Sequence, residues 1–334
     1  MQAEASPPAR PVQAALFLAV AAYAAVFAHG HWEWNLVHPP ADLSLLVQFK
    51  AETPYQYRLL VPLLIRGLEE LGLPALLGLS LEALARWIDG LVVVGIFYAT
   101  RALLGRFLAN RAAAGRWALL ALWALPFLYL LPRMWPYWYP SDTTAVLCMT
   151  LGVLWIRDQD WPKYYWLFPL ATLNRESTSF LIAVFALTQF GRLRLSALAA
   201  HLAVQTAIWI TIKALLQFTF IKNEGVGAYF AEALSYNWSL RGEPERWWTL
   251  SMVYGFLWIP LAWLSRHVRD PFVRRSLVLV PLFFVVSYVL AQFDELRVYG
   301  EMLPLVVLGV AVGARDRRAR RDGVGARATA PSAP

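Results

Sequence analysis

The 334-residue sequence contains little charge and almost no cysteine. Charged residues make up 16% of it and hydrophobic residues 59%, whereas soluble domains are typically about 25% charged and about 45–50% apolar. One cysteine rules out a disulfide-stapled scaffold, and 16 Trp with 18 Phe rule out a disordered chain. Because so much apolar surface needs lipid to cover it, the composition predicts a membrane protein.

The motifs of common soluble enzymes are also missing. The sequence has no Walker-type phosphate loop, no Gly-x-Ser-x-Gly elbow and no His-Glu-x-x-His pattern. His29, His31 and Glu33 offer ligands for a divalent metal if they alternate along an extended segment. Neither a second cysteine nor another histidine pair completes such a site. We therefore assign no cofactor with certainty, and a divalent metal stays an option.

Long apolar runs predict an all-α fold, a polytopic bundle of about ten transmembrane helices. The runs cover residues 12–28, 84–104, 117–131, 143–156, 164–173, 177–190, 195–221, 248–264, 277–291 and 302–312. We expect residues 1–313 to form a single transmembrane module. The basic segment 314–334 is expected to be a disordered cytoplasmic tail.

Four of these runs are too short to cross a bilayer, which takes about 20 helical residues. They are 143–156, 164–173, 177–190 and 302–312. Helices can end inside the membrane where they line an enclosed or watery cavity, so the short runs predict a chamber that opens on the outer side. Residues 164–190 form either a hairpin or one long helix, and basic residues at both ends favour the hairpin.

The distribution of basic residues predicts the orientation. If the N-terminus is cytoplasmic, most of the 30 Lys and Arg fall on the cytoplasmic side, as in most membrane proteins. Both termini are therefore expected in the cytoplasm. The net charge of +8 is explained by topology and requires no nucleic-acid partner. The Ala-, Leu- and Arg-rich composition suggests a GC-rich bacterium, and hence its inner membrane.

The longest segment without a predicted span is an outer loop at residues 30–83. Within it, 59–68 and 71–83 are expected to be helices, separated by Gly72 and Pro74. We place them flat at the outer membrane interface. The alternative is a re-entrant hairpin.

Polar residues gather in several separate segments of the predicted outer face. Ionisable groups near hydrocarbon cost several kcal/mol unless they are paired, so such a cluster marks a candidate site. Alternatively, Arg175 with Glu176 and Glu295 with Arg297 are structural ion pairs, and Asp142 or Ser141 is a helix N-cap. The candidates are Trp32, Glu33, Asp42, Tyr55, Tyr57, Arg58, Arg133, Asp142, Asn174, Arg175, Glu176, Asp294, Glu295, Arg297, Tyr299 and Glu301.

Sugar transfer from a polyprenyl phosphate suits an outward chamber with carboxylates, arginines and aromatic residues. The donor lies in the membrane, its leaving phosphate needs guanidinium or ammonium groups, and the acceptor hydroxyl needs a general base. Apolar grooves would hold the lipid. The expected partners are thus a polyprenyl-phosphate-linked sugar and membrane lipid.

The sequence resembles the GT-C superfamily of integral-membrane glycosyltransferases. The resemblance rests on Asp42 or Glu33 after the first helix, the stretch Thr-Pro-Tyr-Gln-Tyr-Arg-Leu-Leu-Val-Pro-Leu-Leu at 53–64, and Asn-Arg-Glu at 174–176. It implies a GT-C-like fold in which Asp42, or else Glu33, activates the acceptor. The acidic doublet common in that loop is missing, and so is the outer soluble domain of many members.

Under this hypothesis Arg58, Arg175 and Arg297 contact the phosphate, and Trp32, Tyr55 and Tyr299 contact the sugar. Two other readings stay open. A transporter or lipid flippase would also contain broken helices and buried charges. A non-catalytic partner in envelope polysaccharide assembly is the third.

Overall fold

The computed structural model describes residues 10–131, 137–225 and 230–328. Within these ranges the chain forms α-helices and short 3-10 helices and no β-strand, so the expected all-α class is confirmed. The α-helices are α1 (Arg10–Glu33), α2 (Leu43–Val47), α3 (Leu60–Glu70), α4 (Leu73–Leu77), α5 (Leu81–Leu104), α6 (Arg111–Tyr129), α7 (Asp142–Asp158), α8 (Trp161–Asn174), α9 (Ser179–Gln189), α10 (Leu195–Thr219), α11 (Phe230–Ser239), α12 (Pro244–Ser251), α13 (Trp258–Leu264), α14 (Pro271–Ser276), α15 (Leu279–Leu290) and α16 (Leu303–Ala328). The 3-10 helices are η1 (Pro39–Ala41), η2 (Tyr55–Tyr57), η3 (Glu176–Thr178), η4 (Leu240–Gly242), η5 (Val253–Phe256), η6 (Ser265–His267) and η7 (Leu296–Met302).

Six helical stretches in the described ranges are long and apolar enough to cross a membrane. By helix length and composition, the chain is therefore a multi-pass membrane protein. The stretches are Pro11–Glu33, Leu81–Leu104, Arg111–Tyr129, Leu195–Thr219, Pro271–Leu290 and Leu296–Asp322. The expected span at 248–264 is instead divided into α12, η5 and α13, because the backbone of Tyr254 and Gly255 turns to positive φ.

Three of the four short runs form short helices where the sequence predicts them, whereas the fourth, 302–312, is part of the stretch Leu296–Asp322, which is long enough to cross a membrane. α7 has 17 residues, α8 has 14 and α9 has 11. The chain breaks between α8 and α9 at Arg175, whose backbone is extended (φ −161°, ψ 144°). The ring of Trp161, at the start of α8, lies 5.3 Å from that of Phe185, in the second half of α9. The two helices are therefore antiparallel, and the favoured hairpin is confirmed.

The outer loop differs from its predicted form. The first expected helix appears as α3, but the second is only the five-residue α4, followed by the start of α5. Gly72 and Gly78, with φ of +71° and +63°, bound α4 on both sides. These are left-handed conformations that glycine adopts without steric cost, so each ends a helix. Ser80 then caps α5 by accepting from the backbone N–H of Ala83 at 3.1 Å.

The helix α16 forms the centre of the bundle. Residues 303–312 are all buried, and the missing side chains of Gly309 and Gly313 let α13 approach closely. A Cβ at Gly309 would lie 2.5 Å from a methyl carbon of Leu261. The helix continues to Ala328, through most of the segment expected to be disordered, because its Ala and Arg residues favour helix.

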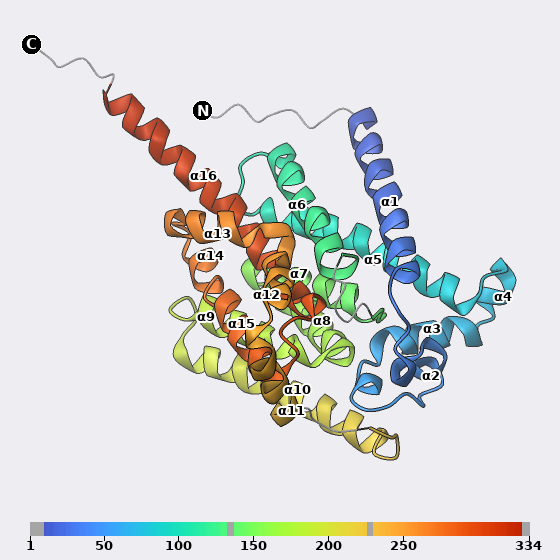
Figure 1. Cartoon of the computed structure of the whole chain (residues 1–334). Coiled ribbons are helices and arrows are strands. Elements are labelled where there is room, and N and C mark those ends of the chain that lie inside the picture. Colours follow the sequence, from blue (N-terminus) through green and yellow to red (C-terminus); the bar gives the residue numbers. More distant parts are fainter. Residues whose placement is uncertain (1–9, 132–136, 226–229, 329–334) are drawn as a thin grey trace, which may run out of the picture.

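Figure 1 shows that α1 begins and α16 ends on the same side of the bundle, while α2, α3 and α11 lie towards the opposite side. We call the first side the terminus end and the second the loop end. At the loop end, the backbone N–H of Leu59 donates to the carbonyl of Leu173 at 2.7 Å, and that of Thr53 donates to the carbonyl of Glu224 at 2.8 Å. The outer loop is thus fastened both to the α8–α9 turn and to the segment after α10.

Candidate functional site

Asp142, the first residue of α7, is the centre of a buried ion network at the loop end. Its side chain has no exposed surface, and its two carboxylate oxygens accept from Arg175 at 3.1 Å and from Arg297 at 3.5 Å. Ser141 is the N-cap residue of α7, so the Asp142 side chain faces these arginines instead of capping the helix.

Each arginine has a second carboxylate on its far side. Arg175 Nε lies 3.2 Å from Glu301 Oε1, and Arg297 Nη2 donates to Glu295 Oε1 at 2.9 Å. Three segments that are distant in sequence therefore build one row of alternating charges. Both guanidiniums are less than 10% exposed, and buried charges are tolerated only when they are paired in this way. The expected pair of Glu295 with Arg297 is confirmed, but Arg175 pairs with Asp142 and Glu301, not with Glu176.

Glu176 belongs to a second, more exposed group of charges. It lies 3.7 Å from Arg58 and 3.7 Å from Lys213 of α10, and its side chain is 44% exposed. Loss of water contact raises the pKa of Glu176, but Arg58, Lys213 and Arg175 outweigh this and lower it to about 2. The Nε and Nη1 atoms of Arg58 are buried and have no hydrogen-bond partner in the described part of the chain.

A cage of aromatic rings adjoins these cations. The guanidinium carbons of Arg297 and Arg58 lie 4.1 Å and 5.6 Å from the centre of the Tyr139 ring. Tyr55 stacks on Tyr139 with ring centres 5.6 Å apart, and the ring of His38 lies 4.8 Å from that of Tyr55. Cations on ring faces gain about 0.5–2 kcal/mol, so Tyr139 stabilises both arginines beside it.

The imidazole of His38 lies among the aromatic rings of the cage. Burial lowers its pKa, Arg297 lowers it further, and Glu295 partly offsets both. Its Nδ1 is buried without a partner among the described residues. This ring nitrogen is therefore placed to accept a hydrogen bond from a ligand hydroxyl.

Many buried polar atoms without a hydrogen-bond partner in the described chain surround the start of α7. Such atoms are rare in folded proteins and usually indicate a ligand, an ion or water. They are His31 Nε2, His38 Nδ1, Arg58 Nε and Nη1, Tyr129 Oη, Trp138 Nε1, Ser141 Oγ, Thr144 Oγ1, Asn174 Oδ1 and Arg297 Nε.

A second buried network links α1, α5 and α7. Asp89 accepts from Thr143 Oγ1 at 2.5 Å and contacts His31 Nδ1 at 2.8 Å. Thr143 follows Asp142 directly, so the two networks meet at the start of α7. Asp89 is not among the predicted site residues, although an aspartate inside the apolar run 84–104 indicates a buried polar site. Because residues 29–33 are helical, His31 lies on a different face from His29 and Glu33. No group of three His, Cys, Asp or Glu in the described ranges is placed to hold a metal.

The two predicted general bases, Asp42 and Glu33, lie apart from these networks. Asp42 caps α2 by accepting from the N–H of Ser44 at 2.8 Å, and Glu33 pairs with Arg86 at 3.2 Å. Neither contacts the arginines of the site. Arg133 lies outside the described residues. Of the rest, Asp294 pairs with Arg246, and Tyr57 lies under the ammonium group of Lys213. Trp32 packs on Trp138. Tyr299 donates to the carbonyl of Phe293, and Asn174 donates to the carbonyl of Ser141.

Gly300 allows the site to close around Tyr129. A Cβ at this position would lie 2.0 Å from the Tyr129 hydroxyl oxygen. Tyr129 is fully enclosed beside the ring of His31, with ring centres 5.4 Å apart. The glycine in η7 therefore brings the segment carrying Arg297 and Glu301 against α6.

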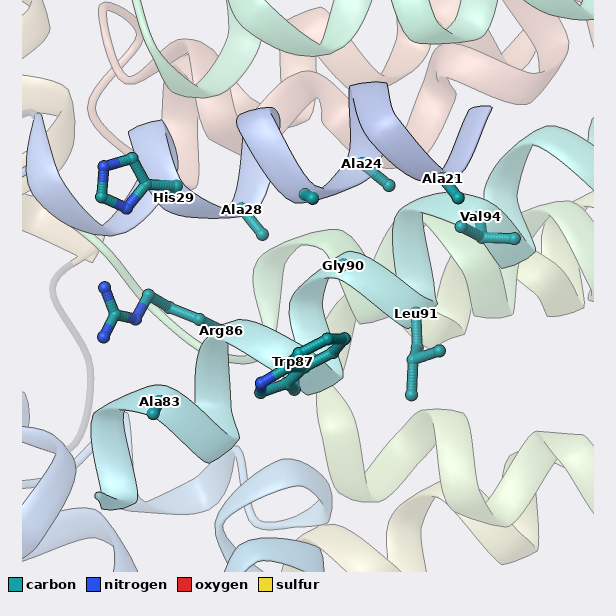
Figure 2. Close-up of a pocket in the computed structure, with 11 residues that line it drawn as sticks. Ala21, Ala24, Ala28, His29, Ala83, Arg86, Trp87, Gly90, Leu91 and Val94 are labelled. Carbon is teal, nitrogen blue, oxygen red and sulfur yellow. The ribbon is translucent and has the colours of Figure 1, made fainter. Parts of the chain in front are cut away.

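Two hollows lie near the network. A polar cleft of about 480 Å³ begins at Pro39 and Pro40, next to His38, and is lined by charged residues that include Lys50, Glu52 and Lys222. An apolar groove of about 310 Å³ runs between α1 and α5 (Figure 2). In Figure 2, His29 and Arg86 lie at one end of this groove and Val94 at the other.

No protein-family model matches the chain, and comparison with curated proteins and with solved structures gives no significant match.

Proposed function

We propose that the chain is a membrane glycosyltransferase that binds a polyprenyl-phosphate sugar donor at the loop end, where the arginine cluster would hold the phosphate. In this proposal the fold is GT-C-like with about ten spans. The loop end faces the periplasm of a bacterial inner membrane, and both termini are cytoplasmic. The observation that carries it is the convergence of Arg58 and Arg297 on the Tyr139 ring, with N–H groups that have no partner in the described chain.

Three features of the cluster favour a phosphate ligand. Guanidinium groups bind phosphate oxygens through paired N–H donors. Arg58 and Arg297 each retain buried N–H groups for such bonds, although their other atoms already contact Glu176, Asp142 or Glu295. Asp142 and Glu295 would fix the Arg297 side chain, so the ligand would meet donors that are already oriented.

The aromatic cage beside the cluster suits a sugar. Tyr55, Tyr137 and Tyr139 surround His38, with ring centres 4.6–6.1 Å from the imidazole. Aromatic faces offer apolar contact and polar edges at low entropic cost. The polar cleft at Pro39 and Pro40 would admit the acceptor.

The proposed chemistry is a single displacement. The acceptor oxygen bonds to the anomeric carbon while the bond from that carbon to the phosphate oxygen breaks. The acceptor proton passes to His38, and the electron pair leaves with the polyprenyl phosphate, whose added negative charge Arg58 and Arg297 stabilise. We favour His38 over Asp42 as the base because Asp42 Oδ1 already accepts from Ser44.

The test is sugar transfer by the full chain in lipid bilayers, with a panel of polyprenyl-phosphate hexoses and pentoses as donors. The variants are His38→Gln, Asp42→Asn and Glu33→Gln, with Glu70→Gln as a surface control. Loss of a general base typically costs about a hundredfold or more. His38→Gln alone should show this loss. If Asp42→Asn or Glu33→Gln shows it instead, the base is the carboxylate nominated by the sequence.

One observation favours a second function, lipid-phosphate transport or binding without chemistry. Every acidic residue of the buried row is paired with a cation, as are Glu176 and Asp294. None of these carboxylates is therefore a free base. Retention or translocation of polyprenyl-phosphate sugars with unchanged bonds, and no transfer with any donor, would establish this function and exclude the enzyme.

A further inference from the structure

A second cluster of cations surrounds Trp263 at the terminus end. The guanidinium carbon of Arg317 lies 3.7 Å from the centre of the Trp263 ring, and that of Arg266 lies 5.6 Å away. The indole is 41% exposed, and the ring of His267 stands edge-on to it with centres 6.1 Å apart. We call Trp263, Arg266, Arg317 and Arg320 the basic patch.

Gly313 creates this arrangement. A Cβ at Gly313 would lie 2.7 Å from the carbonyl oxygen of Leu264 and 2.8 Å from its Cβ. The glycine therefore lets α16 lie against the end of α13. Residues four and seven positions further along a helix face the same way, so Arg317 and Arg320 lie beside Trp263 and η6.

The charge of the basic patch is not compensated within the described chain. No carboxylate there lies within 4.0 Å of the guanidinium groups of Arg266, Arg317 or Arg320, because none of the ion pairs includes them. The acid next to Arg317 in sequence, Asp316, is already engaged. It lies 2.6 Å from Arg315 Nη2 and accepts from the backbone N–H of Arg269 at 2.8 Å.

The charges of the basic patch lower the pKa of the neighbouring His267. Burial lowers the pKa of its imidazole, and Arg266, Arg320 and Arg317 each lower it further. Three like charges thus act on one neutral ring. Such an accumulation repels itself unless an anion lies among the guanidinium groups.

We propose that the basic patch binds the phosphate headgroup of an anionic phospholipid in the leaflet next to the chain termini. The buried apolar part of α16 ends at Val312, and Arg317 follows little more than one turn later, so the patch lies at the depth of lipid headgroups. Basic pockets between membrane helices recognise such headgroups, and an exposed indole is typical of this interface.

The experiment compares lipid retention by three full-length proteins purified in detergent and measured by native mass spectrometry. They are the natural chain, the double variant Arg317→Gln/Arg320→Gln, and the control Arg111→Gln/Arg116→Gln. The control removes two exposed charges from the start of α6, also at the terminus end (Figure 1). The lipids are phosphatidylcholine, phosphatidylglycerol and cardiolipin.

We expect the natural chain and the control to retain the anionic lipids over phosphatidylcholine, and the patch variant to retain them at least about tenfold less. Equal loss in the patch variant and the control would overturn the proposal, because general surface charge would then explain the retention. A thermal stabilisation by inorganic phosphate as large as that by the anionic lipids would overturn it too, since the ligand would then be a free anion. Neither result bears on the loop-end site, so the two proposals fail separately.

Discussion

Asp142 at the loop end is held between two guanidiniums, whereas at the terminus end no carboxylate of the described chain lies within 4.0 Å of Arg266, Arg317 or Arg320. The first arrangement is buried and its charges alternate. The second is exposed and carries one sign. Buried charges must be neutralised within the protein, while exposed charges at a membrane surface are neutralised by lipid and salt. The loop-end charges are thus compensated within the fold, and those at the terminus end are open to the lipid headgroup that we propose.

Removing charged side chains should therefore lower the free energy of unfolding at the loop end and not at the terminus end. This difference is the largest effect we expect. Asp142→Asn leaves Arg175 and Arg297 without their shared carboxylate, and breaking a buried ion pair costs about 3–5 kcal/mol. Arg317→Gln/Arg320→Gln should leave the unfolding free energy in zwitterionic detergent unchanged or higher. Equilibrium unfolding of both variants measures this.

Glu70→Gln is the surface control for Asp142→Asn. Glu70 pairs with Arg66 at 2.8 Å and is 65% exposed, so its loss should cost less than about 1 kcal/mol. Equal destabilisation by Asp142→Asn and Glu70→Gln would show that the buried ion pairs of Asp142 contribute no more to the free energy of unfolding than a surface pair.

Both ends depend on a glycine at a close contact, but the contacts differ. Gly300→Ala clashes with the hydroxyl of Tyr129, a side-chain atom, and Gly313→Ala clashes with the carbonyl of Leu264, a backbone atom. Overpacking of this kind costs about 1–3 kcal/mol. Tyr129→Phe should restore part of the stability of Gly300→Ala, whereas no side-chain truncation at Leu264 should rescue Gly313→Ala. Double-mutant unfolding cycles test both, and lack of rescue by Tyr129→Phe would contradict the first.

The smallest effect concerns pH. The folded-state pKa of Glu176, about 2, is depressed from 4.5. Its contribution to stability is therefore complete above pH 4.5 and is lost as the pH falls towards 2. Because Glu176 is 44% exposed, solvent screening keeps the effect modest. The slope of stability against pH in this window should flatten in Glu176→Gln and stay unchanged in the Glu70→Gln control.

The sequence predicted the helices better than the contacts between them. Apolar runs revealed most of the long helices, and the short runs correctly placed helix ends at the loop end. Asp142, Arg175, Arg297 and Glu301 were nominated because charges in apolar surroundings are expensive. Their pairing was not predictable. Arg175 does not pair with the adjacent Glu176 but with Asp142 and Glu301, and this choice depends on how three segments pack.

Two features of the site, the position of His38 and the role of Asp42, could be recognised only from the folded structure. His38 had no distinguishing neighbour in sequence, and only packing of the outer loop against residues 137–139 brings it among the tyrosines. Asp42 looked like a catalytic carboxylate in sequence, yet it caps a five-residue helix. A capping aspartate and a catalytic aspartate cannot be distinguished until the partners of the carboxylate are known.

The most direct test of the loop-end site is binding of a polyprenyl phosphate to Arg58→Gln. Arg58 has two buried N–H-bearing nitrogens without a partner in the described chain, and its contact with Glu176 is long, at 3.7 Å. We expect retention to fall by at least about tenfold, as loss of a charged hydrogen bond would cause. The unfolding temperature should barely change, and Arg66→Gln should bind normally. Binding by Arg58→Gln equal to that of the natural chain would contradict the proposed phosphate site at the loop end.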